Sequence, residues 1–272
     1  MRLLLTFVCL VVLAATRAEA QVVLGPPLLT LEQAPLRAEL FEARVGTRPL
    51  YVIRAAIPRS ASFQVLAAER PTPLARIVGE RAGVALNGGF YDESGRAMGL
   101  VIQDGREVSK LRKSGGGSGV LTFGPRGFAV VHRGEPVPDG TTQALQSIDR
   151  IVAGAKSVIG PRVSPELDAR SAVASFGDGG ARFYVVFASD VSPASACDAR
   201  GCTFRLDSSS SSAGISLAEL ADFLVAEGAD AALNLDGGYS TSFEARLAGK
   251  RLRVIAFRAT INALFAAPGY AP

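Results

Sequence analysis

The 272-residue sequence contains no tryptophan, one histidine and three cysteines. The histidine, His132, lies in the stretch AVVHRG at the end of a β-like run. A Ser-His-Asp triad would have to use it, and the G-x-S-x-G turn that presents the nucleophile of many hydrolases is absent. Zinc sites built from several histidines and cysteines also lack ligands. We therefore expect no serine-hydrolase triad, no metal and no other cofactor.

Long basic blocks and nucleotide-binding loops are missing as well. The formal net charge is +4, and the arginines are scattered with few aromatic residues among them, which argues against a nucleic-acid partner. The segment KSGGGSG (113–119) has no Lys-Ser or Lys-Thr after its glycines, so it is not a P-loop. DSSSSSAG (207–214) has too few carboxylates for a calcium loop. We interpret both segments as flexible loops.

Cysteine is too scarce for a disulfide-rich scaffold. Cys9 lies in the N-terminal apolar run, which leaves Cys197 and Cys202 in CDARGC. Two nearby cysteines in an oxidising compartment favour one local disulfide. A zinc pair is the alternative, but it has no evident partner ligands.

The one long apolar run stands at the N-terminus. Arg2 precedes apolar residues 3–15, and Ala18-Glu19-Ala20 follows as a cleavage signal. The run is shorter than the ~20 residues that a membrane-spanning helix needs. We expect residues 1–20 to be a signal peptide, with an uncleaved anchor as the alternative. The mature protein would then be exported, periplasmic or secreted, without a stable membrane anchor.

Residues 21–272 have the pattern of a single α+β domain, a mostly antiparallel or mixed β-sheet with packed helices. Turn residues separate β-like runs in three expected hairpins, at 99–109, 119–134 and 171–189. Helices are expected after Pro73 and after Ser216, where Glu219 completes a capping box. The chain should close with one long strand over 252–265.

Two strand-to-turn elements share a design, VALNGGFYD (84–92) and ALNLDGGYS (232–240). In each, a polar residue ends an apolar strand and a Gly-Gly pair follows, which permits positive φ and close approach of a ligand to the backbone. An aromatic residue then offers a platform for a sugar ring. Either element alone is also an ordinary tight turn.

Together with other motifs, these elements resemble the phosphodiester glycosidase family. Most of the mature chain, about 50–265, is covered. Departures are Tyr239 for a family glycine, Ser171 for a threonine, Val191 for a glycine, and an elaboration around 197–212. The matching residues are Asn87-Gly88-Gly89-Phe90-Tyr91, Gly99, Asp104-Gly105, Arg170-Ser171-Ala172-Val173, Asp190, the stretch from Asn234 to Thr241, Arg258 and Asn262.

The resemblance implies hydrolysis of a glycosyl-1-phosphodiester, free or on a glycan, to free sugar and a phosphomonoester. Such chemistry needs a carboxylate near the anomeric carbon and cationic donors for phosphate. Asp236 and Asp190 are the catalytic candidates. A non-catalytic envelope glycan-binding protein, or a phosphodiesterase cleaving P–O, remains the alternative. The substrate-binding candidates are Asn87, Gly88, Gly89, Arg170, Gly237, Gly238, Tyr239, Ser240, Thr241 and Arg258.

Overall fold

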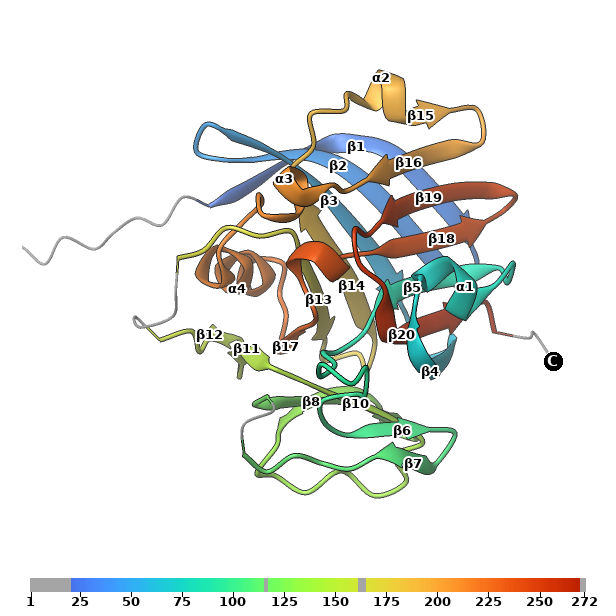
Figure 1. Cartoon of the computed structure of the whole chain (residues 1–272), viewed down its shortest axis with the longest axis vertical. Helices are drawn as coiled ribbons and strands as arrows, with labels where there is room; N and C mark the ends of the chain where they lie inside the picture. The colour runs from blue at the N-terminus through green and yellow to red at the C-terminus, as the bar shows by residue number, and fades with distance from the viewer. Residues whose placement is uncertain (1–20, 115–116, 161–164, 270–272) are drawn as a thin grey trace, which may run out of the picture.

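The computed structural model describes residues 21–114, 117–160 and 165–269, and strands dominate it (Figure 1). The expected signal peptide, 1–20, lies outside the described residues. Within the described ranges, no helix is both long and apolar enough to cross a membrane.

The largest sheet has eight strands in the order β1-β2-β3-β14-β13-β17-β11-β12, and all of its neighbouring pairs are antiparallel. The expected hairpin at 171–189 forms its centre. The strands are β1 (Val22–Gln33), β2 (Leu36–Val45), β3 (Arg48–Ile57), β11 (Asp149–Ala153), β12 (Lys156–Ser157), β13 (Arg170–Ser175), β14 (Ala181–Phe187) and β17 (Ala231–Asn234).

A second sheet has seven strands in the order β15-β16-β19-β18-β5-β20-β4, with a parallel pair at β16 and β19. Buried residues of both sheets, such as Ile53, Phe183, Leu86 and Phe243, meet in one hydrophobic core. The strands are β4 (Ser62–Thr72), β5 (Gly83–Asn87), β15 (Cys197–Asp198), β16 (Gly201–Arg205), β18 (Phe243–Leu247), β19 (Lys250–Ile255) and β20 (Thr260–Ala267).

A five-stranded antiparallel sheet, β7-β6-β10-β8-β9, lies at the bottom of Figure 1. It contains the other two expected hairpins. Asp104 and Gly105 both have positive φ in the first of them, as its tight turn requires. The strands are β6 (Val101–Gln103), β7 (Arg106–Ser109), β8 (Gly119–Gly124), β9 (Gly127–His132) and β10 (Gln143–Ser147).

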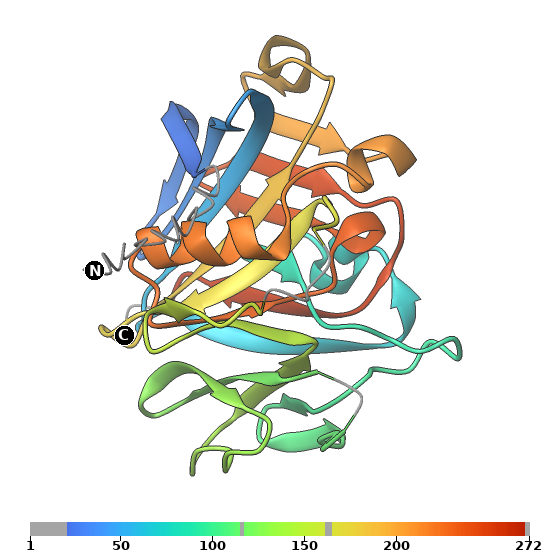
Figure 2. The ribbon, with the colours of Figure 1, turned by 90° about the vertical axis from the view of Figure 1, so that its left-hand side faces the viewer.

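Helices contribute less than the expected α+β pattern implied. The longest described one is α4 (Leu217–Ala226), and the Ser216–Glu219 capping box opens it as expected. Its apolar face packs on the outer side of the eight-stranded sheet, as Figure 2 shows. The others are the short helices α1 (Leu74–Val78), α2 (Pro193–Ala196) and α3 (Ser208–Ser211), and the 3₁₀ turn η1 (Gly238–Ser240).

Two local expectations were wrong. The polyserine segment is not a plain loop, because Asp207 caps its one-turn helix, α3, through a capping box with Ser210. The closing segment is two strands rather than one. In the sheet, β18 and β5 lie between β19 and β20, so the chain must leave the sheet and cross both before it pairs again. Residues 256–259 make this crossing.

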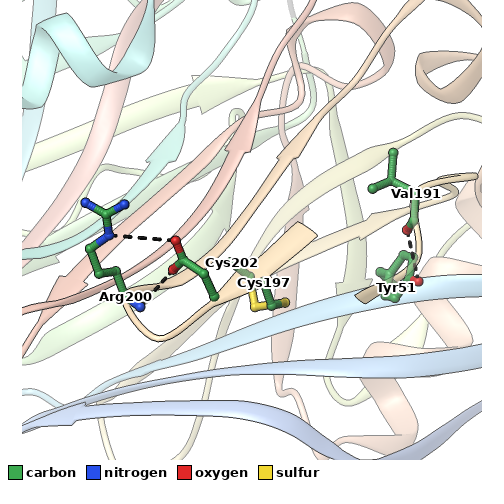
Figure 3. Close-up of a disulfide and its surroundings, with 6 residues drawn as sticks. Tyr51, Val191, Cys197, Arg200 and Cys202 are labelled. Atoms are coloured by element: carbon green, nitrogen blue, oxygen red, sulfur yellow. Dashed lines mark hydrogen bonds and ion pairs between the residues drawn. A yellow bond between two sulfur atoms is a disulfide. The ribbon is translucent and has the colours of Figure 1, made fainter. Parts of the chain in front are cut away.

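The expected disulfide joins Cys197 to Cys202 across the β15–β16 hairpin (Figure 3). Asp198 accepts the Arg200 backbone N–H at 2.8 Å within the turn. Nearby, the Tyr51 hydroxyl donates to the Val191 carbonyl at 3.3 Å. The Tyr51 contact fastens the segment after β14 to the eight-stranded sheet, whereas the other two contacts lie within the β15–β16 hairpin.

Candidate functional site

A cavity of about 520 Å³ opens where the two large sheets come together. The end of β17 and the turn after it form one wall, with the start of β13 beside them. The segment after β5 and the 256–259 crossing supply the remainder. Residues more than 160 positions apart therefore meet in one cavity. Its lining is Phe90, Tyr91, Asp92, Glu93, Asp168, Arg170, Asn234, Asp236, Gly237, Gly238, Tyr239, Ser240 and Arg258.

Asn87 is a hydrogen-bonding hub beneath this cavity. The fully buried side chain accepts from the Ser171 hydroxyl at 2.7 Å and from the Ser242 N–H at 3.0 Å. Its amide nitrogen donates to the Asp236 carbonyl at 2.6 Å and makes a longer contact to the Gly88 carbonyl at 3.4 Å. The amide is thereby committed within the protein. Asn87 does not line the cavity, so it positions the site rather than touching a ligand.

The backbone N–H groups of Gly88 and Gly89 are likewise committed to hydrogen bonds within the protein. Both N–H groups donate to Asn262, Gly88 to its carbonyl at 2.9 Å and Gly89 to its side-chain oxygen at 2.8 Å. A Cβ on Gly88 would overlap the Asn262 side chain, and a Cβ on Gly89 would lie 2.7 Å from the Gln146 carbonyl. These glycines are therefore required for packing against neighbouring strands. Neither amide points to a ligand.

Asp236 lies at the centre of the cavity wall. Its backbone N–H donates to the Gly88 carbonyl at 3.0 Å, which fixes the end of β17 to the end of β5. Burial raises the pKa of its carboxyl from 3.8 to about 6, although a hydrogen bond from Ser240 and the charge of Arg258 both oppose the shift. A carboxyl that titrates near neutrality inside a cavity is a candidate for acid–base or nucleophilic chemistry.

The residues after Asp236 fall into two groups. Gly237, Gly238 and Ser240 line the cavity, and Gly238 has φ +54° while its N–H donates to the Ala169 carbonyl at 2.7 Å. Thr241 is fully buried, and its hydroxyl donates to the same carbonyl at 3.1 Å. Thr241 therefore secures the turn from behind.

Arg170 is a nearly buried cavity residue whose charge is already balanced. Its guanidinium donates to the Ile215 carbonyl at 3.1 Å and to the Glu166 carbonyl at 2.9 Å, and lies 3.2 Å from the Asp168 carboxylate. Burial lowers the pKa of Arg170, while the charges of Asp168, Glu166 and Asp149 raise it. With three carboxylates around it, Arg170 is a weak attractor for a further anion.

Arg258 differs from Arg170 in its exposure to solvent. It lies exposed at the cavity rim, and its backbone N–H donates to the Tyr239 carbonyl at 2.7 Å. The guanidinium lies over the Tyr239 ring, 4.9 Å from the centroid, and the Phe257 ring contacts Tyr239 at 5.4 Å between centroids. Its charge also favours the ionised form of Asp236. Arg258 can therefore meet an anion that enters beside that carboxylate.

The structure does not bring Asp190 into the cavity. Its side chain lies exposed on the bend that follows β14, where the chain leaves towards the disulfide hairpin. Besides Asp236, the carboxylates that line the cavity are Asp92, Glu93 and Asp168. Burial raises the pKa of Asp168 despite the charge of Arg170. Asp168 stands two residues before Arg170, so strand periodicity could have placed both on one face.

Asn234 was also missed as a separate site residue. It is 3% exposed and lines the cavity, and its side-chain oxygen has no hydrogen-bond partner within the described residues. The signal was available, because Asn234 and Asp236 alternate onto one face of the strand that ends there. Across the described ranges, no three His, Cys, Asp or Glu side chains are grouped so that they could hold a metal ion.

Comparisons with known proteins concern the family and the fold. A family model described as phosphodiester glycosidase matches residues 80–264. The catalytic domain of zebrafish N-acetylglucosamine-1-phosphodiester alpha-N-acetylglucosaminidase, auto-inhibited by its pro-peptide, has a similar fold, with TM-score 0.64 and 18% identity over 91% of this chain and 88% of that one. No curated protein matches the sequence.

Two other solved structures share the fold. A hypothetical protein from Synechocystis is 17% identical, with TM-score 0.62, over 89% of this chain and 64% of that one. A protein from Burkholderia pseudomallei, described as exported, is 12% identical, with TM-score 0.52, over 81% of this chain and 74% of that one. At these identities the likeness concerns the fold.

Asn87→Ala should destabilise the protein by about 3 kcal/mol, because it leaves the Ser171 hydroxyl, the Ser242 N–H and the Asp236 carbonyl unpaired and buried. Urea unfolding followed by circular dichroism measures this loss. Ser171→Ala removes one of the bonds and should lose only about 1 kcal/mol. Equal, small losses in both variants would contradict the role of Asn87 as the hub.

Asp236→Asn should change how stability depends on pH. Because the folded pKa of Asp236 is raised, its contribution to stability is fully present below pH 3.8 and is lost as the pH rises through about 6. The full loss corresponds to about 3 kcal/mol. Asparagine does not ionise, so the variant should gain stability relative to the wild type between pH 4 and pH 8. The free energy of unfolding of both proteins is measured by urea unfolding at each pH. If the two values changed with pH in parallel, the raised pKa would be refuted.

Proposed function

The chain belongs to the phosphodiester glycosidase family, and on that premise we propose that it hydrolyses a glycosyl-1-phosphodiester between the sugar C1 and its oxygen. The products are a free sugar and a phosphomonoester. The proposal rests mainly on one observation, that the carboxyl of Asp236 is desolvated and lies beside Arg258 in the same cavity. The zebrafish relative, named for a 1-phosphodiester and a glucosaminidase activity, supports the same class of substrate.

The reaction requires charge stabilisation on both sides of one bond. Water delivers hydroxide to C1 and a proton to the solvent or product, while the C1–O electron pair leaves with the phosphate. Positive charge develops on the sugar ring in the transition state. The ionised Asp236 stabilises that charge and serves as nucleophile or as base towards water. A phosphate leaving group needs little protonation, so a cation at the leaving oxygen suffices.

The cavity residues divide between the two partners of the bond. Arg258, which lies exposed beside Asp236, binds the phosphate. Asp168, Asn234 and the balanced Arg170 offer acceptors and donors to sugar hydroxyls. Ser240 holds the Asp236 carboxyl in place. In this proposal Asn87, Gly88, Gly89 and Thr241 position the site, and Asp190 has no part in it.

The protein acts outside the cytoplasm in this proposal. The N-terminal run has the features of a signal peptide, and a disulfide closes the β15–β16 hairpin, as suits an oxidising compartment. The fold is shared with a protein described as exported.

Turnover in water enriched in heavy oxygen distinguishes this reaction from its rivals. We expect the purified protein, incubated with a panel of methyl glycosyl-1-phosphodiesters, to place the label on the sugar. Label on the phosphate would mean cleavage of P–O, and binding without turnover would mean a glycan-binding protein. Asp236→Asn should lower kcat by about 10³-fold or more. The matched variant Asp190→Asn should lose less than about threefold, since its exposed side chain lies outside the cavity.

The pH dependence of kcat/KM reports which form of Asp236 is active. If the carboxylate acts, kcat/KM should rise about tenfold per pH unit below pH 6 and level off above pH 7. Arg258→Gln should move this limb to higher pH, because the Arg258 charge favours the ionised carboxyl. A rate that falls as the pH rises through 6 would make Asp236 a general acid instead.

A further inference from the structure

The substrate of the proposed reaction has a second half, the alcohol esterified to the phosphate, called here the aglycone. Residues at the cavity rim next to Arg258 are placed to contact it. This inference rests on the proposed function. Arg170 is ion-paired with Asp168, whereas Arg258 is exposed and forms no ion pair among the described residues, so the phosphate lies at the Arg258 side of the cavity. A diester phosphate carries the sugar on one oxygen and the aglycone on another. The aglycone must therefore extend past Arg258, over the 256–259 crossing.

Phe257 is the residue that an aglycone would meet there. Seven large hydrophobic side chains are exposed among the described residues, and Phe257, at 59%, is both the most exposed and the single aromatic one. Its ring contacts the Tyr239 ring at 5.4 Å between centroids. The Arg258 guanidinium lies over the same Tyr239 ring, 4.9 Å from its centroid. An exposed aromatic ring held in place beside a cavity can pack against a ring of a ligand.

A second hollow continues from this rim. It has a volume of about 230 Å³ and shares Arg258 with the main cavity, so residues 257 and 258 form a ridge between the two. Apolar groups from Pro73, Ala75 and Phe257 contribute to its wall, and Arg205 supplies a polar edge. A group lying on the ridge would contact an apolar ring below and hydrogen-bonding groups at the side.

We propose that Phe257 is a specificity-determining residue that packs against a ring in the aglycone, so that the enzyme prefers aglycones with a flat apolar face. That face can belong to a second sugar or to an aromatic alcohol. A methyl or short alkyl aglycone has no flat face and cannot cover the Phe257 ring. Tyr239 supports both Phe257 and Arg258, because its ring contacts the Phe257 ring and lies under the Arg258 guanidinium.

A purely structural role for Phe257 makes a different prediction. If the ring only braces Tyr239 and Arg258, its removal should slow hydrolysis of every phosphodiester by a common factor. If it binds the aglycone, its removal should act on substrates with a ring and change their preference. The ratio of kcat/KM values for two aglycones on the same glycosyl phosphate separates the two roles.

The experiment uses the glycosyl group that the wild type hydrolyses best as a methyl phosphodiester. The methyl ester is compared with a benzyl ester and with an ester of a second sugar. We expect the wild type to prefer at least one ring-bearing ester, and Phe257→Ala to reduce that preference about tenfold. Phe257→Trp should retain it, and Leu28→Ala, which removes an exposed side chain from β1, should leave it unchanged.

Each outcome is decisive. Loss of preference for the sugar ester identifies a second sugar as the source of the ring, and loss for the benzyl ester identifies an aromatic alcohol. An unchanged ratio in Phe257→Ala overturns the inference while leaving the proposed function intact. Failure of the wild type to hydrolyse any ester overturns the proposed function, and the inference with it.

Discussion

The buried amide of Asn87 holds together the segments on which the site depends. It ties the end of β5 to Ser171 of β13 and to the turn after β17, through the Ser242 N–H and the Asp236 carbonyl. These segments belong to two different sheets. The strand hydrogen bonds of β17 connect it only to strands of its own sheet. They cannot by themselves fix Asp236, which follows β17, against a segment of the other sheet. Asn262, on the neighbouring strand β20, has a similar role, because it accepts hydrogen bonds from the N–H groups of Gly88 and Gly89.

The charges of the site follow from this construction. Packing β5 against β17 removes Asp236 from water, and desolvation outweighs both Ser240 and Arg258 in setting its pKa. Arg170 is deeper, but Asp168, Glu166 and Asp149 compensate its charge. The two arginines of the cavity therefore differ, because Arg170 is ion-paired with Asp168 while Arg258 lies exposed. Under the proposed function, that difference favours one orientation of the sugar phosphate.

Local patterns predicted the elements well where the signal was local. The three hairpins and the capping box at Ser216 stand as expected, because turn residues and caps act within a few positions. The closing strand was misjudged because a continuous β-like run does not reveal that its halves pair with different neighbours. Asp190 was chosen for its place after a strand, since the sequence does not show where the chain turns after β14. Asp168 was overlooked although it stands two residues before Arg170.

The sequence by itself determined the family and the pairing of the Gly-Gly turns, and it predicted Asp236 as the catalytic carboxylate, because these depend on residue types in a fixed order. The tertiary structure decided what each residue can reach. Asn87, Gly88 and Gly89 look like ligand-binding groups in the sequence, yet contacts across two sheets occupy their polar atoms. Phe257 looks like any apolar residue of a strand, yet the crossing between β19 and β20 leaves it exposed beside the cavity. Hydrogen-bond satisfaction and solvent exposure are properties of the packed chain, and residue order alone does not contain them.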